Sequence, residues 1–109
     1  MAAVYDLAEN KDAQDYAQDL ADSLSHQPEY REVKASTTMI NDQTVGVVEY
    51  LFDRTVKGQI QTTHHLEYIF PGSLMRYHLD FLAPEAQFEA NRGLFKAIAD
   101  VFTYLQASP

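Results

Sequence analysis

The chain has 109 residues, of which 16 are acidic and 8 are basic, so its formal net charge is −8. One domain is expected at this length. An acidic surface without a Lys/Arg cluster argues against nucleic acid and anionic membranes as partners. Cysteine is absent, which excludes disulfides, thiolate nucleophiles and cysteine-zinc sites. No apolar run approaches the roughly 20 residues of a transmembrane segment.

The first ten residues, MAAVYDLAEN, are compatible with either a short strand or a loose arm. They contain neither a basic region nor an apolar run of the kind found in signal peptides, so we expect no leader here. The sequence does not decide the localisation. A bacterial cytoplasm fits, and so does a periplasm or cell envelope if a leader has been removed.

Residues 11–27 have the apolar periodicity of an amphipathic helix. Asn10 or Asp12 is expected to cap its start, and Pro28 to end it. One face carries acidic residues at spacings of three and four, namely Asp12, Asp15, Asp19 and Asp22. We interpret this face either as a solvated surface or as a contact surface for a basic partner.

Two strands are expected at residues 29–40 and 43–54, joined by a two-residue turn at Asn41–Asp42. That turn places Lys34 opposite Glu49 as a favourable cross-strand pair. Gly46 predicts a bulge or a close contact within the second strand.

A second hairpin is predicted from residues 60–70 and 74–81, which flank the turn signal Pro-Gly-Ser. If the hairpin is symmetric, Phe70 lies opposite Met75. One face is then apolar, and we expect a C-terminal helix to pack on it. The other face is charged and solvated, and carries the cross-strand pairs Glu67 with His78 and His65 with Asp80.

The C-terminal helix is predicted over residues 83–106, with Pro84 in its first turn. Gly93 is expected to allow close packing on the sheet. The predicted fold is therefore α+β, an antiparallel meander of four or more strands with an N-terminal and a C-terminal helix packed on it.

The polar hairpin face is the main candidate site. Its residues are His65, Glu67, Arg76, His78 and Asp80, and Tyr50 is added as an exposed aromatic contact. Two imidazoles and two carboxylates could bind zinc, but solvated His–carboxylate pairs are the simpler interpretation. His64, on the apolar face, is expected to be a core-edge histidine bonded to a backbone carbonyl.

Ser73, His78 and Asp80 are the residue types of a catalytic triad. We interpret Ser73 as a turn-forming serine instead, because the sequence around it is not that of a nucleophile elbow. The four glycines follow no phosphate-binding spacing. We therefore expect no catalytic residue, resident metal or cofactor.

Several phrases resemble the PsbP-like superfamily, which includes a photosystem II extrinsic protein, a Ran-binding nuclear factor, bacterial lipoproteins and Eag-type secretion chaperones. The residues that carry the resemblance are Tyr77, Leu79, Phe81 and Ala83, then Phe88, Phe95, Ile98 and Phe102. The family usually has two strands before its first helix, with a tryptophan near their start. Here only AAVYDLA precedes the helix and tryptophan is absent, so residues 1–109 form either a domain lacking those strands or a shorter variant.

The resemblance implies binding or scaffolding rather than catalysis. The expected function is thus that of a non-enzymatic domain that binds another protein, with homodimerisation through a sheet edge as a further expectation. The alternative is a small-ligand or metal-binding module that uses the polar hairpin face around His65 and His78. An enzyme is the third hypothesis. We rank it last, because the sequence shows no assembled nucleophile or base.

Overall fold

In a computed structural model of the chain, residues 2–7, 11–72 and 75–107 are described, with side chains described for 11–72 and 75–102. The elements in chain order are β1 (Ala2–Leu7), α1 (Ala13–Ser25), β2 (Tyr30–Ile40), β3 (Gln43–Val56), β4 (Gln59–Phe70), β5 (Met75–Pro84), a 3₁₀ turn (Glu85–Gln87) and α2 (Phe88–Ala107). Neither described helix combines the length and the hydrophobicity needed to cross a bilayer.

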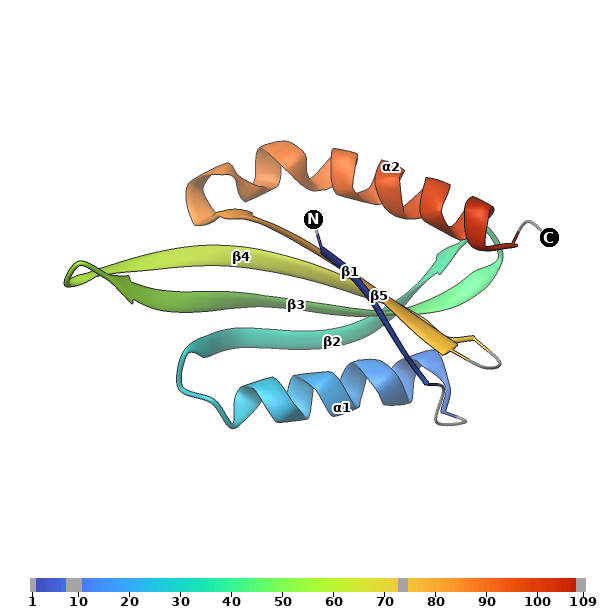
Figure 1. Ribbon diagram of the computed structural model, residues 1–109, viewed down its shortest axis with the longest axis horizontal. Coiled ribbons are helices and arrows are strands. Elements are labelled where there is room, and N and C mark those ends of the chain that lie inside the picture. Colours follow the sequence, from blue (N-terminus) through green and yellow to red (C-terminus); the bar gives the residue numbers. More distant parts are fainter. Residues whose placement is uncertain (1, 8–10, 73–74, 108–109) are drawn as a thin grey trace.

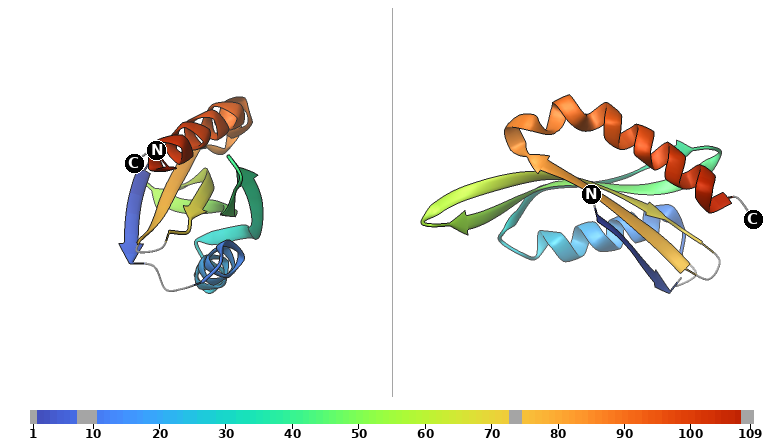
Figure 2. Two further views of the ribbon diagram at one scale, coloured as in Figure 1. Left: turned by 90° about the vertical axis from the view of Figure 1, so that its right-hand side faces the viewer. Right: turned by 45° about the horizontal axis from the view of Figure 1, so that its top comes forward.

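The strands form one antiparallel sheet in the order β1-β5-β4-β3-β2. Strands β2 to β5 follow one another as a meander, and β1 pairs with β5 at the opposite edge from β2. The two helices lie on opposite faces of this sheet (Figures 1 and 2). The predicted α+β class is confirmed, and the first residues form a strand rather than a loose arm.

Helix α1 begins at the predicted cap, since the Asp12 carboxylate accepts a hydrogen bond from the amide of Asp15 at 2.8 Å. Its apolar side packs on β3 and β4 in a cluster that includes Tyr16, Ala17, Val48 and Ile69. The four aspartates of its outer face are exposed, as expected of a solvated surface.

At Gly46, β3 lies close against α1. A Cβ atom at this position would lie 2.6 Å from the carbonyl oxygen of Ala13. The close contact predicted from the sequence is therefore confirmed, and it requires glycine.

Helix α2 covers the other face of the sheet and buries the larger apolar cluster. Its inward side chains are Phe88, Phe95 and Ala99. They pack with Phe70 and Phe81 among the cluster's strand residues, and the rings of Phe81 and Phe95 are stacked at 5.0 Å. The expectation that the C-terminal helix seals the apolar side of the hairpin is confirmed.

Two details predicted for α2 are wrong. Pro84 ends β5, with φ of −52° and ψ of 143°, and the α-helix begins four residues later at Phe88. An X–Pro–X segment is stable in this extended conformation. Gly93 does not contact the described part of the sheet, because a Cβ atom built there meets no described atom outside its own helical segment within 4 Å.

Tight turns fix the first two hairpins. Asn41 and Asp42 have φ of 49° and 65°, and Lys57 and Gly58 have 52° and 78°. Positive φ at both central residues defines a type I′ turn. The predicted turn at Asn41–Asp42 and the pairing of Lys34 with Glu49 are confirmed.

The predicted register of the β4–β5 hairpin is wrong by two residues. Phe70 lies opposite Tyr77, so Glu67 faces Asp80 rather than His78, and His65 faces Leu82 rather than Asp80. Because side chains alternate with a period of two, this shift keeps every residue on its predicted face.

Candidate functional site

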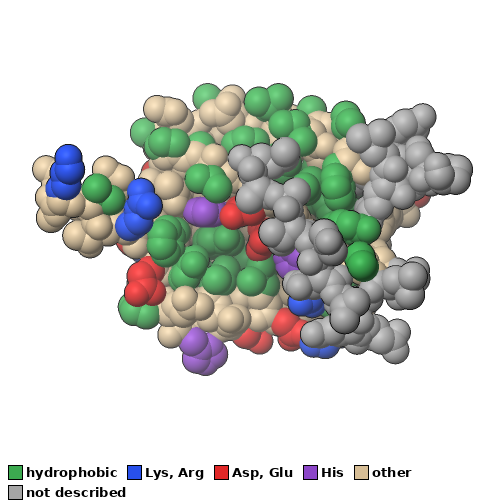
Figure 3. Space-filling view, in the orientation of Figure 1, with side chains coloured by type: hydrophobic (Ala, Val, Ile, Leu, Met, Phe, Trp, Pro, Cys, Tyr) green, Lys and Arg blue, Asp and Glu red, His purple; other side chains and the backbone are tan. Residues whose placement is uncertain are grey.

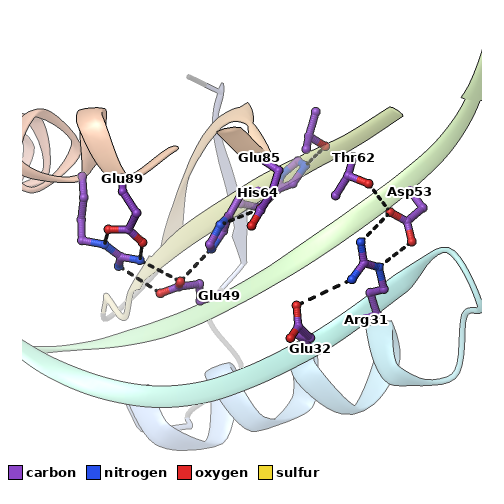
Figure 4. Close-up of polar contacts among 11 residues, drawn as sticks. Arg31, Glu32, Glu49, Asp53, Thr62, His64, Glu85 and Glu89 are labelled. Atoms are coloured by element: carbon purple, nitrogen blue, oxygen red, sulfur yellow. Dashed lines mark hydrogen bonds and ion pairs between the residues drawn. The ribbon is translucent and has the colours of Figure 1, made fainter. Parts of the chain in front are cut away.

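The face of the sheet beneath α2 carries a charged network centred on Glu49 of β3. Its carboxylate accepts two hydrogen bonds from the guanidinium of Arg92 on α2, at 3.1 and 2.9 Å. It also lies 2.7 Å from Nε2 of His64 on β4. Figure 4 shows Glu49 and His64 facing each other between the helix and the sheet. The network therefore connects three elements across two layers of the fold.

His64 is held between two carboxylates and an aromatic ring. Its Nδ1 lies 3.1 Å from Oε2 of Glu85, on the side opposite its contact with Glu49. The ring stacks on Phe88 with centroids 3.7 Å apart. Only an imidazolium offers two N–H donors, so both contacts are satisfied together when the ring is charged. The expectation that His64 bonds a backbone carbonyl is wrong.

The charges of the network stabilise one another. Hydrogen bonding to Arg92 lowers the pKa of Glu49, and the contact with His64 lowers it further against the opposing effect of burial. Hydrogen bonds to Glu89 and Glu49 raise the pKa of Arg92 above its ordinary value. Under neutral conditions, Glu49 is a carboxylate whose charge is already balanced inside the protein.

A second pair lies farther along the same face. Arg31 of β2 donates from Nε to Asp53 of β3 at 2.7 Å, and the hydroxyl of Thr62 donates to the same carboxylate at 2.6 Å. The hydrogen bond from Arg31 is the main cause of the lowered pKa of Asp53. These contacts extend the polar part of the face toward the β3–β4 turn (Figure 4).

The predicted site residues of the hairpin all lie on the α1 side of the sheet. The structure brings together the expected histidine–carboxylate pairs, although each contact is diagonal. Nδ1 of His65 lies 3.1 Å from Asp80 Oδ1, and Nδ1 of His78 lies 3.5 Å from Glu67 Oε1. Figure 3 shows histidine and acidic side chains next to one another among hydrophobic ones.

This face is not solvated, contrary to expectation. The His65, Glu67 and His78 side chains are only 12–13% exposed. Helix α1 covers part of the face, and the guanidinium of Arg76 lies over the Tyr16 ring at 4.8 Å. Nε2 of His78 is buried and has no hydrogen-bond partner among the residues that the structure describes. These pairs therefore belong largely to the packed interior.

Tyr50 is not the exposed aromatic that the sequence suggested. It is buried, and its ring stacks on His65 with centroids 4.7 Å apart. Burial raises the pKa of its hydroxyl, and the nearby carboxylate of Asp80 adds to the effect. Tyr50 thus packs against His65 inside the protein.

His65 also bonds to Thr63, two residues earlier on β4. The hydroxyl oxygen of Thr63 lies 2.9 Å from Nε2 of His65, whose other nitrogen contacts Asp80. A pocket of about 230 Å³ opens beside them, lined by Phe52, Arg54, Gln61, Thr63, His65 and Leu82. The Ser73–His78–Asp80 trio is not placed, since Ser73 lies outside the described residues. Among the described residues, no three His, Cys, Asp or Glu side chains are grouped to hold a metal ion.

A groove beside α2 opens next to the charged network. We call it the α2 groove; its volume is about 430 Å³. It is lined by Thr38 of β2, Val47 and Glu49 of β3, Leu66 and Tyr68 of β4, and Glu89, Arg92, Gly93 and Lys96 of α2. Its floor is largely apolar, and its helix side is charged.

The sequence did not indicate that Glu49, Glu85 and Arg92 form part of a site. One signal was available for Glu49, since a carboxylate inside the apolar run Val-Val-Glu-Tyr-Leu needs a partner when a strand is covered. No spacing pattern indicated that the partner would be Arg92.

Comparison with protein-family models, curated proteins and solved structures finds no match to this chain.

Proposed function

We propose that this chain is a non-enzymatic domain that binds another protein, and that the α2 groove is its contact surface. The observation that carries the proposal is the open groove between α2 and the β2–β3 half of the sheet. Helix α2 packs its aromatic side chains on β4 and β5. Over β2 and β3 the groove leaves Thr38 and Val47 only partly covered.

The composition of the groove supports protein binding. Val47, Leu66 and Tyr68 supply an apolar floor, and charged side chains border it on the α2 side. Protein interfaces commonly combine an apolar centre with a polar rim. A groove of about 430 Å³ has room for one or two apolar side chains of a partner.

The charged network supports binding in preference to acid–base catalysis. Glu49 accepts hydrogen bonds from Arg92 and contacts His64, so its charge is already matched. A general base must instead be within reach of a substrate proton. In the proposed role, the network fixes the distance between α2 and the sheet and so keeps the α2 groove open.

A photo-cross-linking experiment tests this proposal. A photoreactive amino acid replaces Thr38 at the groove, or Ile60, which is 73% exposed near the β3–β4 turn. The chain is then illuminated in cells of its source organism. We expect a defined adduct from position 38 and not from position 60.

Gly93 offers a matched pair of variants for the same experiment. Gly93 lines the α2 groove, and a Cβ atom added there meets no described neighbour within 4 Å. The long side chain of Gly93→Arg should therefore fit without a clash, occupy the groove and suppress the adduct. Gly93→Ala adds one methyl group and should leave the adduct intact. Equal adducts from positions 38 and 60, or an adduct unaffected by Gly93→Arg, would reject the α2 groove as the contact surface.

A second candidate function is the binding of a small anion beside His65. The pocket of about 230 Å³ favours it, because it combines the Arg54 cation, the Thr63 hydroxyl and the apolar side chains of Phe52 and Leu82. Titration with benzoate, followed by NMR of the His65 ring, tests it. A response of this ring that Arg54→Gln weakens would support the function, and an unchanged ring at millimolar benzoate would reject it.

A further inference from the structure

Strand β2 forms one edge of the sheet, and its outer side has no neighbouring strand in the part of the chain that the structure describes. In the type I′ turn, the carbonyl of Ile40 accepts the hydrogen bond that closes the hairpin. The backbone N–H and C=O groups of Ile40, and of every second residue before it, therefore point toward β3. The backbone N–H and C=O groups of Ala35, Thr37 and Met39 point away from the sheet.

The outward part of β2 lacks the usual protection of an edge strand. Lysine side chains and bulges commonly prevent an edge from pairing with another chain. In β2 the lysine and the bulge both lie at the N-terminal end of the strand, where the register shifts between Arg31 and Lys34. Residues 35–39 are uncharged and regularly paired with β3. Met39 is 58% exposed.

The same segment of β2 borders the α2 groove. Thr38 forms one side of that groove, and Val47 forms its floor on the neighbouring strand. A strand added beside β2 would present every second side chain on the α2 side of the sheet. One of these side chains would reach the groove while its backbone pairs with β2.

The N-terminal end of β2, which carries the bulge between Arg31 and Lys34, has acidic side chains around it. Glu32 and Glu85 are both exposed, and with Lys34, Glu49 and His64 they line a pocket of about 200 Å³. Glu49 is paired with Arg92, Glu85 contacts His64 at 3.1 Å, and Glu32 lies 3.7 Å from Arg31. The side chains of Glu32 and Glu85 are nevertheless 66% and 51% exposed, so each can accept a further cation. Together with the net charge of −8, they favour a cation on the incoming segment.

From these observations we infer that the partner contributes an extended, basic segment that adds to β2 as a sixth strand of the sheet. Its backbone pairs with the outward groups of Ala35, Thr37 and Met39. One apolar side chain enters the α2 groove, and a lysine or arginine lies near Glu32 and Glu85. This inference rests on the proposed function and names the chemistry of the partner.

The test uses a synthetic peptide of about ten residues, a common strand length. The peptide alternates valine and threonine, has lysine near both ends and has blocked termini. A second peptide carries glutamate in place of lysine, and a third has N-methyl groups on alternate amides. Binding to the full ¹⁵N-labelled chain is followed by the amide signals.

The expected result is a shift of the signals of residues 34–40 and 43–49 with the lysine peptide. Weaker binding is expected for the glutamate peptide and for the N-methyl peptide. Thr37→Pro removes an outward N–H without disturbing the bonds to β3, so it should weaken binding about tenfold or more. Thr37→Ala keeps that N–H and should bind like the original chain.

Three outcomes of the peptide titrations would overturn the inference. These are no binding of any peptide at millimolar concentration, equal binding by the Thr37→Pro and Thr37→Ala variants, and signal changes confined to β1 and β5. Self-association that Thr37→Pro abolishes would also overturn it, because the occupant would then be a second copy. Cross-linking at Thr38 that persists in Thr37→Pro would leave the proposed function standing while rejecting strand addition.

Discussion

The guanidinium of Arg92 donates hydrogen bonds from both of its terminal nitrogens to the carboxylate of Glu49, at 3.1 and 2.9 Å. This pair joins α2 to the middle of β3 at the side of the α2 groove. Since α2 packs on the sheet largely through apolar side chains, the pair is a directional contact that helps to fix how the helix lies.

The first prediction concerns the charge of Glu49. Glu49→Gln keeps the shape of the side chain but removes the charge that faces Arg92 and His64, and we expect it to lower the free energy of unfolding by about 1–2 kcal/mol. Urea unfolding followed by circular dichroism measures the change. Glu89→Gln is the control and should have little effect, because Glu89 is 72% exposed. A larger loss for Glu89→Gln than for Glu49→Gln would contradict the account.

The second prediction is a dependence of stability on pH. The pKa of Glu49 is lowered in the folded chain, chiefly by hydrogen bonding to Arg92. Its contribution to stability is therefore complete above the unfolded pKa, near 4.5, and is lost as the pH falls through the lower folded pKa. Urea midpoints measured between about pH 6 and pH 3 should fall less steeply in Glu49→Gln than in the original chain. Parallel curves would show that Glu49 carries no such contribution.

The third prediction is that Gly93→Ala stabilises the protein. Alanine favours a helix interior by about 1 kcal/mol over glycine, and the added methyl group meets nothing within 4 Å. Thermal unfolding should therefore occur at a higher temperature. Destabilisation by this substitution would mean that Gly93 packs against a surface that the structure shows as open.

The fourth prediction concerns the other helix. Gly46→Ala places a methyl group 2.6 Å from the backbone carbonyl of Ala13, so α1 must move away from β3. We expect a loss of about 1–3 kcal/mol in the free energy of unfolding, as for other overpacked cores. Denaturant unfolding checks the value. A neutral effect would show that α1 lies farther from the sheet than described.

The sequence was sufficient for the layers and for the pairing of β2 with β3, but not for the pairing of β4 with β5. Alternation in β4 and β5 assigned each side chain to its face, because a shift of two residues does not change the face. The register itself depends on how the chain crosses the Pro-Gly-Ser segment, and the symmetric turn assumed from the sequence was wrong. The contacts of His65 with Asp80 and of His78 with Glu67 exist because long side chains reach diagonally.

The candidate site was harder to predict than the fold. Arg92 is 43 positions from Glu49, and its reach to that carboxylate depends on where α2 begins. Since the helix starts at Phe88 and not in the turn of Pro84, the sequence alone could not place Arg92 above β3. The polar face of the hairpin was predicted to be exposed to solvent, because nothing in the sequence showed how much of it α1 covers.

Hydrogen exchange on the chain with and without its cross-linked partner tests the central claim most directly, namely that the α2 groove and the adjoining part of β2 receive another protein. The account predicts slower amide exchange in residues 34–40 and 43–49 when the partner is bound, with little change in α1. Protection confined to α1 or to β1, with residues 34–40 unchanged, would contradict it.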